Sequence, residues 1–344
     1  MLREGGSPPG SGDERDGRHR GWSRRTFLQG AGALGAGLAA GWLGRHGLGL
    51  PADVFIAKAV RYESDLAALI ASGLRELRIG PAQIEGRRIL LKPNLVEPHV
   101  ESSHVNTHPL VVRGAAEAFL RLGAAQVIVA EGQGHYHDSL LVLDESGLGE
   151  VLLEDRIPYV DLNYDALYSV SNRRGRSRLE TLTFPRTLRE VDWIVSVPKL
   201  KTHHYTGVTL SMKNFFGVMP GIVYGWPKNV LHWAGIDKSI LDICSALRPH
   251  LAIVDGVVGM EGDGPIMGAP KRAGVVVMGR SLPAVDATCC RVMGIDPHRV
   301  PHLAAASEWL GPVREDRIVQ RGEPVAAVRT DFRLLEAHRA RALG

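Results

Sequence analysis

The sequence is poor in cysteine, which limits the redox chemistry that the chain can carry alone. Cys244, Cys289 and Cys290 are its three cysteines, and no Cys-x-x-Cys occurs. An ordinary iron–sulfur cluster needs four thiolates, so no such cluster is expected here. Adjacent cysteines rarely bridge each other, which leaves open a disulfide from Cys244 to one of the pair. The favoured interpretation is three buried, small apolar side chains.

Several familiar motifs of nucleotide sites and hydrolases are also missing. The chain has neither a full Gly-x-Gly-x-x-Gly pattern nor a Walker A loop, so nucleotide binding by those routes is not expected. It has no Gly-x-Ser-x-Gly either, which disfavours a serine hydrolase. Two glycine pairs, in the segments 132–134 and 262–264, could still approach a phosphate through backbone N–H groups.

The main part of the chain has almost no excess of charge. The formal net charge is +4, and the segment up to Arg45 contains seven arginines and four acids, a balance of +3. Only +1 therefore belongs to the remainder. Because the basic character lies in the N-terminal segment, the composition does not predict a nucleic-acid partner.

The N-terminal segment is typical of an export signal. Residues 1–22 contain hardly any apolar side chains and are predicted to be a disordered leader. Residues 23–50 begin with Ser23-Arg24-Arg25-Thr26-Phe27-Leu28, which resembles the twin-arginine signal. The uncharged run 30–44 would span about 22 Å as a helix, less than the roughly 30 Å of a bilayer core. We therefore expect the twin-arginine translocase as a partner and a periplasmic or other extracytoplasmic location. A membrane tether formed by an uncleaved leader stays open.

Strand and helix patterns alternate from residue 51 to the end. This alternation predicts an α/β fold, a mostly parallel sheet with helices on both faces, formed by a single large domain over residues 51–344. Loops are expected at 172–178, as a hairpin tip or surface loop, and at 218–230, as a lid or a subdomain boundary. The strands are expected at 53–60, 88–91, 126–130, 159–162, 179–184, 193–197, 251–254 and 274–278, and the helices at 64–77, 109–122, 144–153, 236–247, 283–293 and 302–310.

The stretch from Asp192 to Gly217 carries the strongest functional signal. An apolar, β-rich run over 193–197 predicts a buried strand that ends at Pro198. Lys199, Lys201 and His203 follow at once, and Lys213 comes ten residues later. The three lysines are candidate catalytic residues, because crowded lysines lower one another's pKa and one of them could then act as a general base.

Other strands also deliver polar residues at their carboxyl ends, where parallel sheets bind ligands. The expected result is a cleft for a small anionic ligand at that edge of the sheet. Its predicted ligand-binding residues are Lys92, Asn94, His203, Asn214 and Gly217. A metal ion in the same cleft stays open, with weak candidates in Glu131, His135 and Asp255. The cofactor, if there is one, is not identified.

A set of short motifs resembles the family called domain of unknown function 362, over about residues 53–330. The motifs are Lys92-Pro93-Asn94-Leu95-Val96, Val197-Pro198-Lys199-Leu200-Lys201-Thr202-His203, Met212-Lys213-Asn214-Phe215-Phe216-Gly217, Ile253-Val254-Asp255-Gly256, Gly264-Pro265 and Pro283-Ala284-Val285-Asp286. The resemblance implies an α/β domain whose reaction is not settled. Some members are joined to ferredoxin-type modules, and others carry twin-arginine leaders. This chain lacks the cysteine clusters, so electron transfer would need a separate redox partner protein.

Two functional hypotheses follow. The first is an exported α/β protein that binds an anionic ligand or cofactor in a cleft lined by Lys, His and Asp, and that acts as an enzyme. The alternative is a non-catalytic binding or accessory protein of an exported redox or iron–sulfur system. A lysine with a lowered pKa in a dry pocket would favour the enzyme, and a wide, wet, basic groove would favour the binding protein.

Overall fold

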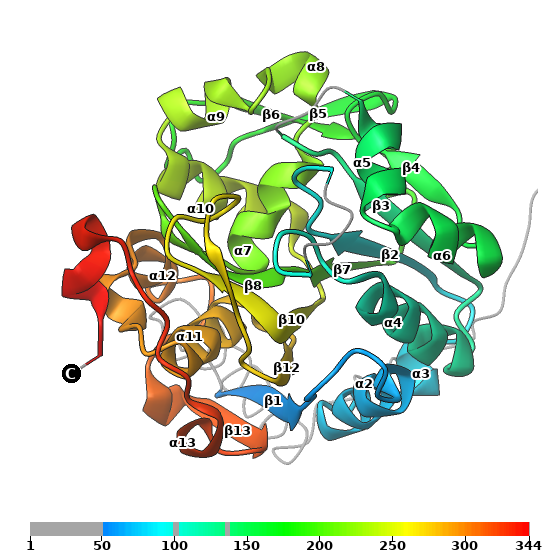
Figure 1. Ribbon diagram of the computed structural model, residues 1–344. Helices are drawn as coiled ribbons and strands as arrows, with labels where there is room; N and C mark the ends of the chain where they lie inside the picture. Colours follow the sequence, from blue (N-terminus) through cyan, green and yellow to red (C-terminus); the bar gives the residue numbers. More distant parts are fainter. Residues whose placement is uncertain (1–50, 99–102, 135–137, 344) are drawn as a thin grey trace, which may run out of the picture. The chain divides into compact units, whose positions relative to one another are not determined.

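The computed structural model describes residues 51–98, 103–134 and 138–343. The predicted leader, the predicted twin-arginine segment and the metal candidate His135 lie outside these residues. From residue 49 on, the chain forms one unit, built from alternating strands and helices (Figure 1). The predicted α/β class is confirmed.

Eleven strands of the described residues form one mixed sheet, with a core order of β13-β1-β12-β10-β7-β2-β3-β4. Six of its pairings are parallel: β1 with β13, β10 with β7 and β8, β2 with β3 and β7, and β3 with β4. The strands of this sheet are β1 (Ala52–Lys58), β2 (Arg88–Pro93), β3 (Gln126–Glu131), β4 (Tyr159–Asp161), β7 (Trp193–Val197), β8 (Lys199–His203), β9 (Gly207–Thr209), β10 (Leu251–Glu261), β11 (Ala269–Lys271), β12 (Val275–Gly279) and β13 (Ile318–Gly322).

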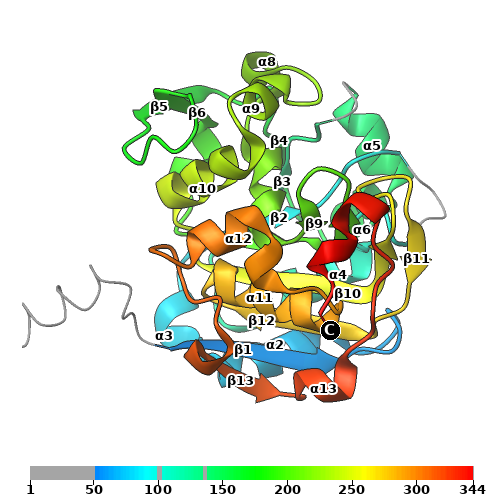
Figure 2. The same cartoon turned by 90° about the vertical axis from the view of Figure 1, so that its left-hand side faces the viewer.

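Helices cover both faces of the sheet, as Figures 1 and 2 show. On one face lie α2 (Leu66–Glu76), α3 (Pro81–Ile84), α4 (Pro109–Arg121), α5 (Ser139–Glu145) and α6 (Leu148–Glu154). On the other lie α7 (Ser211–Asn214), α10 (Ile236–Leu247), α11 (Leu282–Val292) and α12 (Pro301–Ala306). The remaining helices are α8 (Gly221–Tyr224), α9 (Asn229–Trp233), α13 (Val325–Val328), η1 (Arg186–Arg189), η2 (Phe215–Val218), η3 (Pro297–Arg299), η4 (Glu315–Arg317) and η5 (Glu336–Arg341).

Each face of the sheet has its own hydrophobic core, and the strand pattern explains why. Side chains alternate between the two faces along a strand. In β2, Leu90 packs into the core under α10 and α11, while Ile89 and Leu91 pack into the core under α2 and α4. Because both faces are covered, the central strands are apolar almost without interruption, as parallel sheets require.

The structure differs from the sequence-based expectation in several segments: β9, β11 and β13 were not expected, and β10 extends beyond the expected 251–254. The helix expected over 144–153 is two helices, because Gly147 adopts a positive φ of 69° between α5 and α6. The hairpin around 172–178 is present, but its first strand, β5 (Leu167–Ser171), pairs with β6 (Thr181–Pro185) in a separate two-stranded sheet. The segment after Pro198, expected as a loop, is the strand β8. In the described residues, no helix is long and apolar enough to cross a membrane.

Candidate functional site

Lys92 and Glu131 form a buried ion pair at the carboxyl ends of two neighbouring strands. Lys92 lies in β2, Glu131 ends β3, and the Lys92 Nζ is 2.6 Å from the Glu131 carboxylate. The same ammonium donates to the carbonyl of Pro93 at 2.8 Å, and the carboxylate accepts from the N–H of Leu95 at 3.0 Å. Burial lowers the pKa of Lys92, and the negative charge of Glu131 partly offsets this effect.

Asn214 and Gly217 close over this pair, as neighbours along α7 and η2. The Asn214 side chain accepts from Lys92 Nζ at 3.1 Å and donates to the Lys92 carbonyl at 3.0 Å. Gly217 has no room for a side chain: a Cβ there would lie 2.5 Å from Lys92 Nζ, and closer still to a carboxylate oxygen of Glu131. The predicted set of Lys92, Asn214 and Gly217 is therefore one packed unit with Glu131.

The position of α7 is fixed by Asp286 on α11. The Asp286 carboxylate accepts from the N–H groups of Ser211 and Met212, at 2.8 and 2.9 Å, and from the Ser211 hydroxyl at 2.5 Å. These are unsatisfied donors at a helix start, so Asp286 acts as a cap from another element. Complete burial raises the pKa of Asp286 to about 6, while the three hydrogen bonds oppose that rise. This contact holds Lys213 and Asn214 above the sheet.

Lys199 and Asp255 form a second buried ion pair. They are opposite each other in the register of β8 and β10, with 2.5 Å between Lys199 Nζ and the Asp255 carboxylate, and both side chains are fully buried. Asp255 also accepts from the Tyr62 hydroxyl at 3.1 Å and from the His108 N–H at 3.0 Å. Tyr62 and His108 are stacked rings with centroids 3.6 Å apart. This cluster lies outside the cavity described below.

Lys201 is also fully buried, and in the described part of the chain it has no carboxylate partner. Its Nζ donates to the carbonyls of Val105, at 2.7 Å, and Pro265, at 3.2 Å. Burial and the charges of Lys199 and Lys213 together lower its pKa well below the ordinary value. Lys199 and Lys201 thus face inward from β8 and do not line the cavity.

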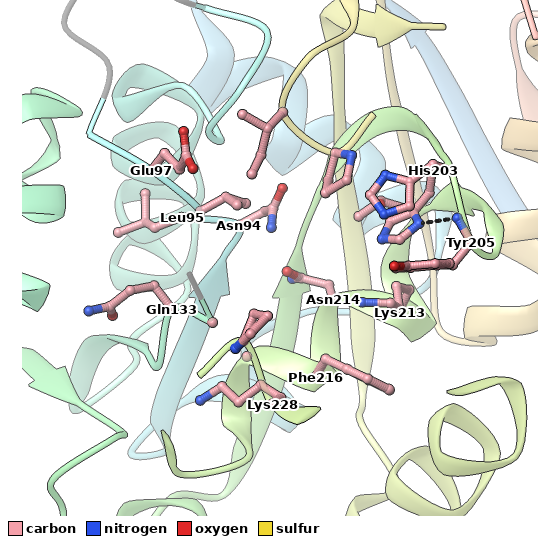
Figure 3. Close-up of a pocket in the computed structure, with 18 of the residues that line it drawn as sticks. Asn94, Leu95, Glu97, Gln133, His203, Tyr205, Lys213, Asn214, Phe216 and Lys228 are labelled. Atoms are coloured by element: carbon pink, nitrogen blue, oxygen red, sulfur yellow. Dashed lines mark hydrogen bonds between the residues drawn. The ribbon is translucent and has the colours of Figure 1, made fainter. Parts of the chain in front are cut away.

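A cavity of about 490 Å³ lies above the Lys92–Glu131 pair. Figure 3 shows Lys213 beside Asn214 and Phe216, with His203 and Tyr205 on the neighbouring wall. Of the predicted residues, Lys92, Asn94, Glu131, His203, Lys213, Asn214 and Gly217 line it. The other lining residues are Leu95, Val96, Glu97, Gln133, Gly134, His204, Tyr205, Thr209, Phe216, Pro227, Lys228, His232, Asp263, Pro265, Ile266 and Met267.

Lys213 differs from the other lysines of this region in its lack of a partner. In the described residues, its ammonium has no hydrogen bond and no carboxylate within ion-pair distance, and it lies 4.1 Å from the centroid of the Phe216 ring. Such a contact between a cation and a ring face is favourable but does not satisfy the N–H donors. Burial, followed by the charge of Lys92, lowers the pKa of Lys213 to about 7.

Lys228 was missed as a site residue by the sequence analysis, although it lies in the predicted lid segment. The lid residues 218–230 contain α8 and the start of α9, and Lys228 precedes α9 with a positive φ of 68°. Its Nζ donates to the Asn163 side chain at 2.6 Å and to the Met219 carbonyl. Burial lowers the pKa of Lys228 to about 7. In the sequence, only its position in the Trp226-Pro227-Lys228 stretch of the predicted lid could have pointed to Lys228 as a site residue.

Two histidines of the cavity wall have their tautomers set by the backbone. His203 Nδ1 accepts from the N–H of Tyr205 at 3.0 Å, so the neutral ring carries its proton on Nε2. His232 Nδ1 is 3.1 Å from the Lys228 carbonyl and must donate to it, which leaves the neutral ring an acceptor at Nε2. Burial, and then the charge of Lys213, lower the pKa of both rings, so both are neutral at pH 7. Together, the two rings offer one donor and one acceptor to the cavity.

Two buried polar groups of the lining have no hydrogen-bond partner within the described residues. They are the Asn94 Oδ1 atom and the Thr209 hydroxyl, on side chains that are 8% and 4% exposed. Buried polar groups are almost always hydrogen-bonded in folded proteins. A ligand that carries hydrogen-bonding groups would satisfy them, and this agrees with the predicted role of Asn94.

The three metal candidates are not brought together in the described residues. Glu131 and Asp255 are each bound by a lysine, and His135 lies outside the described residues. No group of three or more His, Cys, Asp or Glu side chains that could hold a metal occurs in the described ranges. The metal site stays a prediction. Cys244, Cys289 and Cys290 are free and buried, so the interpretation as apolar core residues is confirmed.

Comparison with known proteins gives a family but no reaction. The family described as Domain of unknown function (DUF362) matches residues 89–291. A thylakoid-associated protein of Synechocystis sp. is 27% identical over 234 residues, which cover 66% of this chain and 68% of that protein. A crystal structure of a protein from Thermotoga maritima is 14% identical, with a TM-score of 0.38, and the match covers 68% of this chain and 59% of that one.

Proposed function

Because the chain belongs to the family Domain of unknown function (DUF362), whose description assigns no reaction, we propose a function from the cavity itself. The cavity binds a small organic anion, and Lys213 acts on that ligand as an acid–base residue. The single observation that supports this proposal is that the Lys213 ammonium has no partner among the described residues, in a cavity whose carboxylate Glu131 is already bound by Lys92.

The electrostatics of the inner wall favour an anion. Lys213 and Lys228 both border the cavity, and neither has a carboxylate within ion-pair distance in the described residues. Of the other lining carboxylates, Asp263 is 55% exposed and lies 3.7 Å from His204, and Glu97 is partly exposed. An anion placed near Lys213 would therefore meet uncompensated positive charge in a partly desolvated setting, where such contacts are stronger than in water.

Acid–base chemistry is favoured over simple binding by the pKa of Lys213. A group with a pKa of about 7 is present in both protonation states at neutral pH, which is the condition for efficient proton transfer. The neutral His203 and His232 rings beside it supply a further donor and acceptor. A purely electrostatic binding groove needs none of these features. The proton-transfer groups around Lys213 thus favour the enzyme over the alternative of a binding or accessory protein.

The test uses sulfate, whose charge does not change between pH 6 and pH 8. Protonated Lys213 attracts the anion, so sulfate affinity, measured by titration calorimetry, should fall by about tenfold from pH 6 to pH 8. Lys213→Met should abolish both the binding and its pH dependence. Lys58→Met removes one exposed positive charge outside the cavity and should leave both unchanged. Equal sulfate binding by the parent and by Lys213→Met would contradict the proposal.

We also propose export by the twin-arginine route, on the strength of Arg24 and Arg25 ahead of the uncharged run. The thylakoid, with which the Synechocystis relative is associated by name, is a membrane compartment, which is compatible with an extracytoplasmic role. Replacing both arginines by lysine keeps the charge and should leave the protein in the cytoplasm, as cell fractionation would detect. Delivery of the double-lysine variant at the parent level would refute export by this route.

A further inference from the structure

The amine of Lys213 is accessible to a ligand in the cavity, whereas the amines of the neighbouring lysines are already hydrogen-bonded. Three lysines line the cavity in the described residues. Lys92 is bound by Glu131, and Lys228 donates to Asn163 and to a backbone carbonyl. Lys213 has no hydrogen bond within the described residues, and its nitrogen lies 4.1 Å from the centroid of the Phe216 ring. Its amine is therefore the one that a ligand in the cavity can reach without breaking an existing hydrogen bond.

Two conditions make a lysine amine reactive, and the site supplies both. The amine must lose its proton at neutral pH, which desolvation and a second nearby cation bring about. Burial and the charge of Lys92 have this effect on Lys213 and lower its pKa to about 7. The amine must also escape capture by a carboxylate. Glu131, the carboxylate of the inner wall, is occupied by Lys92 and by two backbone N–H groups.

We propose that Lys213 forms an imine with the aldehyde or ketone carbonyl of a small anionic ligand. The inference rests on the proposed function, because the anion is what brings the carbonyl into the cavity. It narrows the ligand class to carbonyl compounds that carry a phosphate or carboxylate. It also gives Lys213 a covalent role in addition to proton transfer.

The step balances with groups already at the site. The neutral Lys213 nitrogen attacks the carbonyl carbon, a C–N bond forms, and the carbonyl π electrons move to oxygen. A proton passes from nitrogen to that oxygen, for which the His232 Nε2 acceptor can serve as the carrier. The nitrogen lone pair then forms the C=N bond as the C–O bond breaks, and the second amine proton passes to the departing oxygen by the same carrier, so that water leaves. The His203 Nε2–H can donate a hydrogen bond to that oxygen. No oxidant or reductant is needed.

The unpartnered polar groups agree with this path. The product of Lys213 addition to the carbonyl carries a new hydroxyl group, and hydrogen bonds have to keep this group in position until it leaves as water. The Thr209 hydroxyl and the Asn94 amide line the cavity, and both lack a partner for an oxygen atom.

The experiment uses pyridoxal 5′-phosphate, which carries an aldehyde and a phosphate. Pyridoxine 5′-phosphate, which lacks the carbonyl, serves as the matched anion. The full chain is incubated with the aldehyde at pH 7, reduced with borohydride and mapped by peptide mass spectrometry. Lys213 should be modified at least about tenfold more than the exposed Lys238 in the same sample. Pyridoxine 5′-phosphate should suppress that modification and form no adduct itself.

Lys213→Arg keeps the positive charge but cannot form the imine. It should still bind pyridoxine 5′-phosphate, as a thermal shift would report, and the remaining lysines should be modified only to the Lys238 level. If the matched anion binds while Lys213 and Lys238 are modified equally, the imine is refuted and the anion site stands. If Lys213 is modified but the matched anion neither binds nor protects, the anion site is refuted and the reactive amine stands.

Discussion

Replacing Lys199 by methionine should destabilise the protein strongly. From the sequence, Lys199 is a candidate catalytic residue of the cleft, and loss of a catalytic lysine need not weaken the fold. In the structure, Lys199 is fully buried and lies 2.5 Å from the equally buried Asp255. Methionine keeps the aliphatic stem, so the substitution isolates the effect of the ammonium.

The size of the expected loss of stability depends on the interactions that the Asp255 carboxylate keeps in the variant. Its carboxylate would keep the Tyr62 hydroxyl and the His108 N–H as donors, but it would lose its only cation within ion-pair distance in the described residues. Removal of one partner from a buried ion pair costs about 3–5 kcal/mol, because the other charge stays buried without compensation. For a unit of this size, that corresponds to a fall in Tm of roughly 6–12 °C.

The measurement is urea unfolding at pH 7, supported by thermal melting. Lys213→Met is the matched control, since Lys213 has no ionic partner in the described residues and its loss should therefore not lower the free energy of unfolding. A second substitution, Asp255→Asn on the Lys199→Met background, removes the stranded charge and should restore part of the loss. If Lys199→Met melts with the parent, the pair carries no stability and the reasoning is wrong.

Two further predictions test the close packing and the charge of the site. Gly217→Ala should lower the free energy of unfolding, measured in urea, by about 1–3 kcal/mol, because the new Cβ would lie 2.5 Å from Lys92 Nζ. Gly80→Ala is the control, since a Cβ at that position would have nothing within 4 Å. Equal losses of stability in the two variants would contradict the packing argument. The pKa of Lys213 is lowered from 10.5 to about 7 in the folded state, so the folded protein binds fewer protons than the unfolded chain between those values. Stability relative to Lys213→Met should therefore rise with pH across that window, and parallel stability curves for the two proteins would contradict the shift.

The fold could be predicted from the sequence because its signals are local. Apolar β-rich runs bounded by Pro and Gly, alternating with amphipathic stretches, give strands such as β2, β3 and β7 at nearly the expected bounds. The rule that parallel strands end at one edge also brought Lys92 and Glu131 together correctly. Asn214, which was predicted for the same cleft, joins this edge through hydrogen bonds to Lys92.

Which lysines face a ligand could not be predicted, since that depends on partners far away in the chain. The Lys-x-Lys pattern after Pro198 suggests a solvated loop, yet β10 pairs with that segment and turns it into the strand β8. Asp255 then neutralises Lys199, across 56 residues of sequence. Lys201 is held by the carbonyls of Val105 and Pro265, and no side-chain pattern reports on backbone acceptors. Lys228 was missed for the same reason.

The distribution of partners among these lysines is itself an argument for a ligand. A buried cation without a partner is costly, and a fold under selection for stability alone would pair it or replace it. Lys92 and Lys199 are paired with carboxylates, while Lys201 and Lys228 donate to uncharged oxygen atoms. Lys213 lacks both kinds of partner in the described residues, and it lines the cavity. The uncompensated charge therefore lies where a ligand can reach it, as expected of a site that gives up stability for function.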